Sequence, residues 1–364
     1  MEAAPSGSSF WARALDWTRR IVAFLVVVGF LGAILLLLAA LFFYQSGYRP
    51  LPREGVEIET GEWAGADSSV LAEDRLRILS LDLDYGAGED GSRPELGDPS
   101  HPGAARVTEV LDRLAALALE QKADVLVLQR VDFGSEFAGD ADQAGYLARK
   151  LGWGYVARSR TWKHSYLPYP DPLAEDLLGR VDLGHAVVSR VPIIEAARFS
   201  LPMETLDNWW MSTFAPAPNV LGAVLLTRGR QLLVFDAALT CGQLHARESQ
   251  ARDLARVLNQ ESTGNAILAL SLCAPPRDLK QAGKGRADHS LDLVRYRRNL
   301  QTPFVERDAL ADPDTWATHR MEDGRMVLHD YLMPEKGLLL RTFQVLKPEP
   351  PLSSHRPLLL EVAW

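Results

Sequence analysis

Cysteine is scarce in this sequence: only Cys241 and Cys273 occur among 364 residues. Two cysteines cannot form the several bridges of a small disulfide scaffold, and these two lack the paired spacing of a zinc site. An excess of positive charge is also missing, because the formal net charge is -8. A chain without a basic field has no domain-wide means of holding a phosphate backbone, so we expect no nucleic-acid partner.

One long apolar segment contains neither a charged residue nor a proline. Residues 21–43, IVAFLVVVGFLGAILLLLAALFF, are long enough as a helix to cross a hydrocarbon core of about 30 Å. A cleaved signal peptide would have a shorter apolar run and a small-residue exit, whereas this run ends in Leu41, Phe42 and Phe43. The segment therefore predicts an uncleaved transmembrane helix in contact with membrane lipid.

Arginines flank the apolar segment on both sides, with three before it and two after it: Arg13, Arg19, Arg20, Arg49 and Arg53. The small excess on the N-terminal side predicts, by the positive-inside rule, that residues 1–20 are cytoplasmic. The C-terminal part is then expected on the extracytoplasmic, periplasmic side of a cell inner membrane.

The rest of the chain divides into a linker and one large domain. Residues 44–74 are rich in Gly, Pro and acidic residues without sustained periodicity, which is typical of a tether. From residue 75 to 364, short apolar runs alternate with amphipathic segments, which predicts an α/β sandwich with helices outside the sheets. Strands are predicted at 75–84, 124–129, 185–190, 222–228, 231–239, 265–272, 326–333, 342–347 and 356–364, and helices at 105–122, 143–152 and 245–261.

The order of these strand ends resembles the endonuclease/exonuclease/phosphatase family, whose fold is shared by pancreatic-type deoxyribonucleases, abasic-site endonucleases and sphingomyelinases. The resemblance covers residues 75–364 and implies a two-sheet α/β sandwich. It is carried by LRILSLDLDYG at 76–86, ADVLVLQRV at 123–131, LGHAVVSRVPI at 183–193, VFDAALTCG at 234–242, AILALSLCAPP at 266–276, LHDYLM at 328–333 and SSHRPL at 353–358.

Active members of that family hydrolyse phosphodiesters with a divalent cation. The residues that they use for this reaction are Asn, Glu, His, an Asp–Asn pair and an Asp–His pair, which follow one another at successive strand ends. This sequence departs from the pattern at most of those positions. The replacing residues, in the same order, are Asp82, Arg130, Ala238, Ser271 with Cys273, and Ser354. Only Asp330, His355 and Asp84 remain of the charged set.

Arg130 stands where the resemblance places the main metal-binding carboxylate. A guanidinium has no lone pair for a metal and repels a divalent ion, so we predict no metal and no catalytic residue here. We favour an ion pair with Asp82 that fills the former metal position; the alternatives are an anionic ligand held by Arg130, or exposure to solvent. For Asp330 and His355 we favour a structural hydrogen bond over a catalytic dyad.

Two further features carry expectations. Trp209, Trp210, Met211 and Phe214 form an apolar cluster that either caps the domain or contacts a membrane or partner protein, and residues 161–172 look like a loop on the rim of the cleft. Cys241 and Cys273 follow two strands that should end close together, so they form either a disulfide or two buried thiols.

These observations predict a membrane-anchored, catalytically inactive protein that acts as a structural or accessory subunit of a larger membrane protein complex. The alternative is a Mg²⁺-dependent phosphodiesterase that acts on phospholipid head groups or other phosphodiesters. Its atypical site would be built from Asp82, Asp84, Asp330 and His355.

Overall fold

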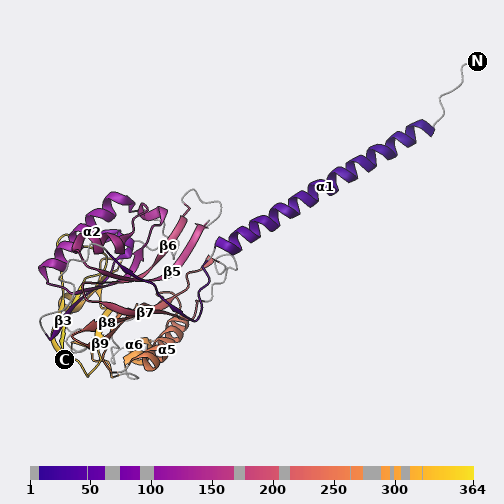
Figure 1. Ribbon diagram of the computed structural model, residues 1–364. Helices are drawn as coiled ribbons and strands as arrows, with labels where there is room; N and C mark the ends of the chain where they lie inside the picture. Colours follow the sequence, from indigo (N-terminus) through magenta and orange to yellow (C-terminus); the bar gives the residue numbers. More distant parts are fainter. Residues whose placement is uncertain are drawn as a thin grey trace, which may run out of the picture. The chain divides into compact units, whose positions relative to one another are not determined.

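A computed structural model describes residues 8–46, 48–61, 74–90, 102–167, 177–204, 214–262, 264–273, 288–295, 299–304, 312–321 and 323–364. The chain divides into two compact units, Met1–Gly47 and Tyr48–Trp364. The described part of the first unit is helix α1 (Ser8–Ser46; Figure 1). Its segment Arg13–Phe42 is long and apolar enough to cross a membrane, and none of its most apolar window is buried. This helix contains the whole apolar run that the sequence marks as a membrane span.

The second unit is an α/β sandwich of two mixed sheets, which confirms the predicted fold class. Within the described residues, the spatial order of the seven-stranded sheet is β14 (Leu339–Val345), β15 (Leu358–Ala363), β3 (Arg75–Asp82), β4 (Val125–Asp132), β6 (Gly179–Ser189), β5 (Tyr155–Leu167) and β2 (Ile58–Thr60). The six-stranded sheet has the order β1 (Arg53–Gly55), β7 (Ile193–Ser200), β8 (Asn219–Thr227), β9 (Arg230–Ala238), β10 (Ala266–Ser271) and β13 (Asp330–Pro334).

Helices cover the outer faces of the sandwich (Figure 1). Those near the seven-stranded sheet are α2 (Gly103–Glu120) and α3 (Gln143–Leu151), and those against the six-stranded sheet are α5 (Leu244–Glu261) and α6 (Ser290–Arg295). The shorter described elements are η1 (Asp84–Gly86), η2 (Gly88–Asp90), η4 (Glu136–Ala138), α8 (Pro313–Trp316), and the pair β11 (His319–Arg320) and β12 (Met326–Val327).

The continuous apolar run of β4 reflects burial on both faces of its sheet. Val125 and Val127 belong to the core between the two sheets, together with residues of β8 and β10 such as Leu221 and Ile267. Leu126 and Leu128 alternate with them and are equally inaccessible to solvent. Each such side chain contributes about 1.5–3 kcal/mol by its removal from water. A strand covered on both sides therefore needs no polar alternation.

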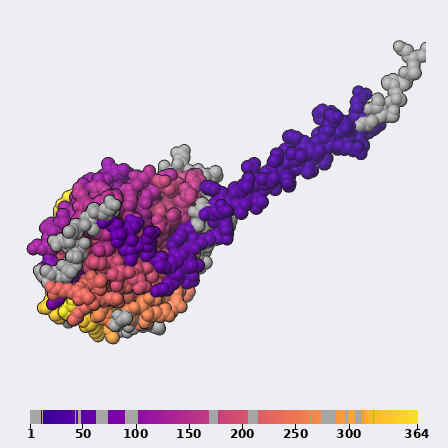
Figure 2. Space-filling model, viewed as in Figure 1, coloured from indigo at the N-terminus to yellow at the C-terminus, as the bar shows by residue number. Residues whose placement is uncertain are grey.

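The folded unit extends further toward the N-terminus than the sequence indicates. Residues 48–61 supply β1, which pairs with β7, and β2, which pairs with β5. They lie across the surface between the magenta and the red-orange parts of the unit (Figure 2). Residues 161–167, expected in a loop, instead continue strand β5, while 168–172 lie outside the described residues. The segment predicted as a linker thus provides an edge strand to each sheet.

Candidate functional site

The candidate site lies where β3, β4, β9 and β10 end. Asp82, the last residue of β3, pairs in register with Gln129 of the parallel strand β4. In the other sheet Ser271, at the end of β10, is flanked by Ala238 of β9 and by Asp330 at the start of β13. The carboxyl ends of parallel strands meet at one edge of a sheet, which explains why residues far apart in sequence converge here.

Arg130 reaches this site through an irregular backbone. Its φ is +47°, in the left-handed region, and the register of β4 against β6 shifts between Leu128 and Val131. Such a bulge leaves one residue unpaired and redirects its side chain. Asp84 and Tyr85, just beyond β3, also have positive φ values of 48° and 56°. Each of these conformations costs on the order of 1–3 kcal/mol, which the surrounding contacts must offset.

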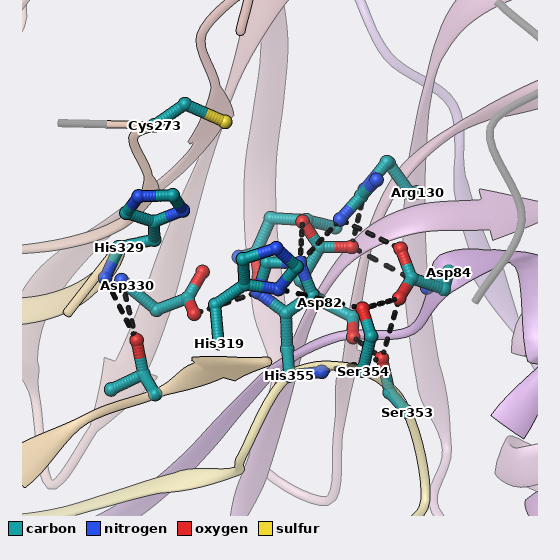
Figure 3. Close-up of polar contacts among 12 residues, drawn as sticks. Asp82, Asp84, Arg130, Cys273, His319, His329, Asp330, Ser353, Ser354 and His355 are labelled. Atoms are coloured by element: carbon teal, nitrogen blue, oxygen red, sulfur yellow. Dashed lines mark hydrogen bonds and ion pairs between the residues drawn. The ribbon is translucent and has the colours of Figure 1, made fainter. Parts of the chain in front are cut away.

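The Arg130 guanidinium contacts three side chains at once (Figure 3). Its Nε donates to Oδ1 of Asp82 at 2.6 Å, and its Nη2 lies 2.7 Å from Oδ1 of Asp84 and 2.6 Å from Nε2 of His355. Both carboxylates are 1% exposed and the arginine side chain is 14% exposed. The ion pair with Asp82 predicted from the sequence is therefore present, and Asp84 is a second partner that the sequence did not indicate.

His355 connects Arg130 to Asp330. Its Nδ1 lies 2.7 Å from Oδ2 of Asp330, so the imidazole that accepts from Arg130 at Nε2 is the neutral form that donates from Nδ1. Burial lowers the pKa of His355, but Asp330, Asp82 and Asp84 together raise it above its usual value. Protonation at Nε2 would place two donors face to face, so acid is expected to break the contact between His355 and Arg130.

The carboxylate of Asp82 holds its charge for an electrostatic reason. Burial raises the pKa of Asp82, yet Arg130 and then His355 lower it by more, so its pKa is below the usual range. Asp84 accepts from the hydroxyls of Ser353, at 3.1 Å, and Ser354. Ser354 therefore acts as a hydroxyl donor to a buried carboxylate.

A second histidine, His319, was not indicated by any sequence motif. It lies on β11, forms an antiparallel bridge with His355, and stacks its ring on that of His355 with centroids 4.1 Å apart. On its other side the ring of His329 is stacked at 5.1 Å. All three rings are buried. The imidazole of His355 is thus held by packing as well as by hydrogen bonds.

A buried polar layer lies behind Arg130 between the sheets. Gln129 donates from Nε2 to Oδ1 of Asp236, and Nδ1 of His185 lies 4.0 Å from Oδ2 of the same carboxyl. Burial raises the pKa of Asp236 well above its usual value and lowers that of His185 to about 4. Burial therefore favours the uncharged forms of both Asp236 and His185.

Divalent metal is the cofactor that the resemblance implies, and the residues can be tested for it. Asp82, Asp330 and His355 each offer one ligand atom, all within 4.8 Å of one another. Two of the three are already bonded to Arg130. A fixed cation a few ångströms from a divalent ion costs several kcal/mol at an effective dielectric near 20. The arrangement with Arg130 in place does not fit a metal ion.

The remaining predicted residues fall into three groups. Cys241 and Cys273 form a disulfide with Cα atoms 5.0 Å apart beside the site, which resolves the choice left open by the sequence. Phe214, predicted as a contact residue, is 3% exposed; its ring packs against that of His164 and its carbonyl accepts from Trp162. It serves the core rather than a contact surface. Trp209, Trp210 and Met211 lie outside the described residues.

No protein-family profile and no curated protein matches this sequence. Among solved structures, the chain is similar to an endonuclease/exonuclease/phosphatase from Beutenbergia cavernae, with 16% identity over 79% of this chain and 71% of that chain and a TM-score of 0.56. It is also similar to a family protein from Leptotrichia buccalis (14% identity, 79% and 100% covered, TM-score 0.54). A third is a mannosyl-6-phosphatase from Bacteroides thetaiotaomicron (12% identity, 79% and 100% covered, TM-score 0.52). At these identities the likeness establishes the fold, which is that of the endonuclease/exonuclease/phosphatase proteins.

Proposed function

We propose that this chain is a membrane-anchored protein that has lost metal-dependent phosphodiester hydrolysis and acts as a structural or accessory subunit of a larger membrane protein complex. The observation that carries the proposal is the position of Arg130. Its guanidinium is hydrogen-bonded to Asp82 and His355, two of the three side chains that could otherwise hold a metal ion, and it forms an ion pair with Asp84. A positive charge is thus supplied by the chain itself, and it cannot coordinate a substrate oxygen as a metal does.

The neighbouring strand ends supply no replacement for the lost chemistry. Ala238 has no functional side chain, and Ser271 occupies the position of a metal-binding acid. Cys273 is in a disulfide and so offers no thiolate. In the described part of the chain, the polar side-chain contacts of the His355 ring are to Arg130, Asp330 and Asp82, none of which is a hydroxyl or thiol nucleophile. This combination supports an inactive role.

Placement of the domain outside the cytoplasm is part of the proposal. The small excess of arginines before the apolar segment favours a cytoplasmic N-terminus. The pairing of Cys241 with Cys273 adds an independent argument, because disulfides persist in oxidising compartments such as the bacterial periplasm. Both features support the extracytoplasmic side of the inner membrane as the location of residues 75–364.

Metal titration of the full-length protein in mild detergent tests the proposed loss of catalysis. We expect no heat of Mg²⁺ or Mn²⁺ binding for the wild-type chain, and weak binding for Arg130→Gln, which removes the repelling charge but adds no carboxylate. Arg130→Glu should gain binding, because it places a fourth carboxylate among Asp82, Asp84 and Asp330. Metal-dependent hydrolysis of bis(p-nitrophenyl) phosphate by the wild-type chain, lost in Asp330→Ala, would show that the protein is an enzyme.

The accessory role has its own test. The full-length protein purified in mild detergent should carry a partner in fixed stoichiometry, identified by mass spectrometry. A single-component, monodisperse chain at native expression level would contradict the role in a complex. The outcome of this purification does not depend on the outcome of the metal titration.

A metal-dependent phosphodiesterase remains the second candidate because of one observation. Oδ2 of Asp82 and Oδ1 of Asp330 have no hydrogen-bond partner in the described part of the chain, although both are buried. These oxygens are of the type that Mg²⁺ prefers. Such an enzyme would require Arg130 to leave Asp82 and His355 when metal binds, so the titration above separates the two candidates.

A further inference from the structure

The chain enters the folded unit at the same end of the sandwich as the candidate site. Strand β5 runs antiparallel to β6, and β6 runs antiparallel to β4, so β5 and β4 end on the same side. Near the end of β5, the carbonyl of Lys163 accepts from the amide of Tyr48 at 3.0 Å. In the other sheet the amide of Ser200, the last residue of β7, donates to the carbonyl of Pro52 at 2.9 Å. The first residues of the unit are thus tied to both sheets at their site end.

This entry point is firmly anchored. The hydroxyl of Tyr48 donates to Glu54 at 2.8 Å, and its ring lies 5.6 Å from the guanidinium carbon of Arg198. Arg198 is 1% exposed and donates to the carbonyls of Arg160 and Ala217. A buried guanidinium with this many bonds holds one rotamer. The position of Tyr48 on the unit is therefore fixed.

Exposed apolar side chains lie around this entry. Leu51 is 64% exposed, Tyr166 42% and Met203 49%. Leu51 lies beside the end of β7, where its carbonyl accepts from the hydroxyl of Ser200. Tyr166 is the second-to-last residue of β5, and Met203 lies three residues after the end of β7. Single exposed apolar residues are common, so their meaning depends on what the chain brings close to them.

Sequence continuity brings a membrane close to them. Only Gly47 separates α1 from Tyr48, and two consecutive Cα–Cα steps of 3.8 Å span at most roughly 8 Å. We propose that the site end of the sandwich faces the lipid headgroups of the membrane that α1 spans, with Leu51, Tyr166 and Met203 as the contact residues. The inference rests on the proposed membrane anchor. A tyrosine with its ring in apolar surroundings and its hydroxyl in water suits this layer.

The consequence is that the candidate site lies beside the bilayer surface. In the seven-stranded sheet β5 is three strands from β3, which corresponds to about 14 Å at the usual strand spacing. The opposite end of the sandwich is separated from the site end by the length of β3, which is roughly 23 Å for its eight residues. Any partner that reaches Arg130 and His355 would do so at the level of the headgroups.

The opposite end offers matched control positions. Leu119 is 58% exposed and Leu339 is 52% exposed. Leu119 lies two residues before Gln121, whose carbonyl accepts from Arg77 at the beginning of β3. Leu339 pairs with Ala363, which pairs with Arg75, the first residue of β3. Both controls are exposed apolar residues, like the proposed contacts, but at the far end of the strands.

Depth-dependent quenching in nanodiscs tests the inference on the full chain. Because the two native cysteines are paired, a single introduced thiol can carry a fluorophore in Leu51→Cys, Tyr166→Cys, Leu119→Cys or Leu339→Cys. With lipids spin-labelled at the headgroup, labels at 51 and 166 should lose fluorescence, and labels at 119 and 339 should keep it. The four variants change exposed side chains only, so retention of the disulfide serves as their folding control.

The outcomes separate this inference from the proposed anchor. If the protein enters the nanodiscs but all four labels are equally bright, or only 119 and 339 are quenched, the proposed orientation is refuted and the anchor stands. If the full chain does not enter nanodiscs at all, the anchor fails and the orientation fails with it.

Discussion

Replacing Arg130 by alanine should be among the most destabilising single changes in the domain. The substitution leaves Asp82 and Asp84, both 1% exposed, without their cationic partner, and removal of one member of a buried ion pair costs about 3–5 kcal/mol. Alanine keeps the Cβ atom and hence the strain of the positive φ, so no relief of backbone strain offsets this loss. Urea unfolding of the full chain in detergent, followed by tryptophan fluorescence, measures the change in unfolding free energy.

The control is Arg228→Ala. Arg228 also has a positive φ, 45°, and also forms an ion pair, with Asp74 at 2.8 Å, but the two side chains are 39% and 64% exposed. Exposed pairs contribute about 0–1 kcal/mol, so a small change is expected. A loss below about 1 kcal/mol in Arg130→Ala, equal to that of the control, would refute the description of Arg130 as the counter-ion of a buried acidic cluster.

The loss of unfolding free energy in Arg130→Ala should also depend on pH. The pKa of Asp82 is below its usual value in the folded chain, so its contribution to stability is present above the unfolded pKa of about 3.9 and is lost as pH falls through the folded pKa. Without Arg130 that depression of the pKa disappears. The difference in unfolding free energy between wild type and variant should therefore be largest near neutral pH and shrink below about pH 4.

Two further outcomes are expected. Burial raises the pKa of Asp236 well above its usual value. Above about pH 4 the unfolded chain therefore releases a proton that the native state keeps. The free energy of unfolding should then fall as pH rises toward the folded pKa of Asp236. Asp236→Asn should flatten that fall in urea titrations from pH 5 to 8, and parallel wild-type and variant curves would count against a protonated Asp236. Cys273→Ser should lower the unfolding free energy by about 3–4 kcal/mol, the chain-entropy value for a loop of this length. Two thiols open to alkylation in denatured, unreduced protein from its own compartment would contradict the disulfide.

The sequence predicted the core strands because their physical signal is strong. A run such as Val125–Leu128 excludes water on both faces, and few structures other than a covered strand accommodate it. The edge strands gave no such signal. β1 and β2 have three residues each and are mostly exposed, so their sequence carries little apolar pattern. They are held by backbone hydrogen bonds to β7 and β5, which any sequence without proline at those positions can make.

The candidate site was predictable in its membership and not in its geometry. Asp82, Asp330 and His355 were expected together because the family resemblance places the ends of these strands at one site, and the observed strand pairing agrees with that expectation. The second ion pair, from Arg130 to Asp84, depends on a bulge and on two left-handed residues, Asp84 and Tyr85. Such conformations are rare for residues other than glycine and leave no periodic trace in a sequence. His319 was missed because nothing local relates it to His355.

The net charge of the site argues against an anionic ligand. Three buried carboxylates, those of Asp82, Asp84 and Asp330, face one guanidinium, so two negative charges remain when His355 is neutral. This excess is the reason the pKa of His355 is raised even though the ring is buried beside Arg130. A phosphate group would have to displace two carboxylates from Arg130 and then sit among them. Under the proposal that catalysis is lost, Arg130 acts as a built-in counter-ion of these carboxylates, and the negative charge that remains disfavours a phosphate ligand.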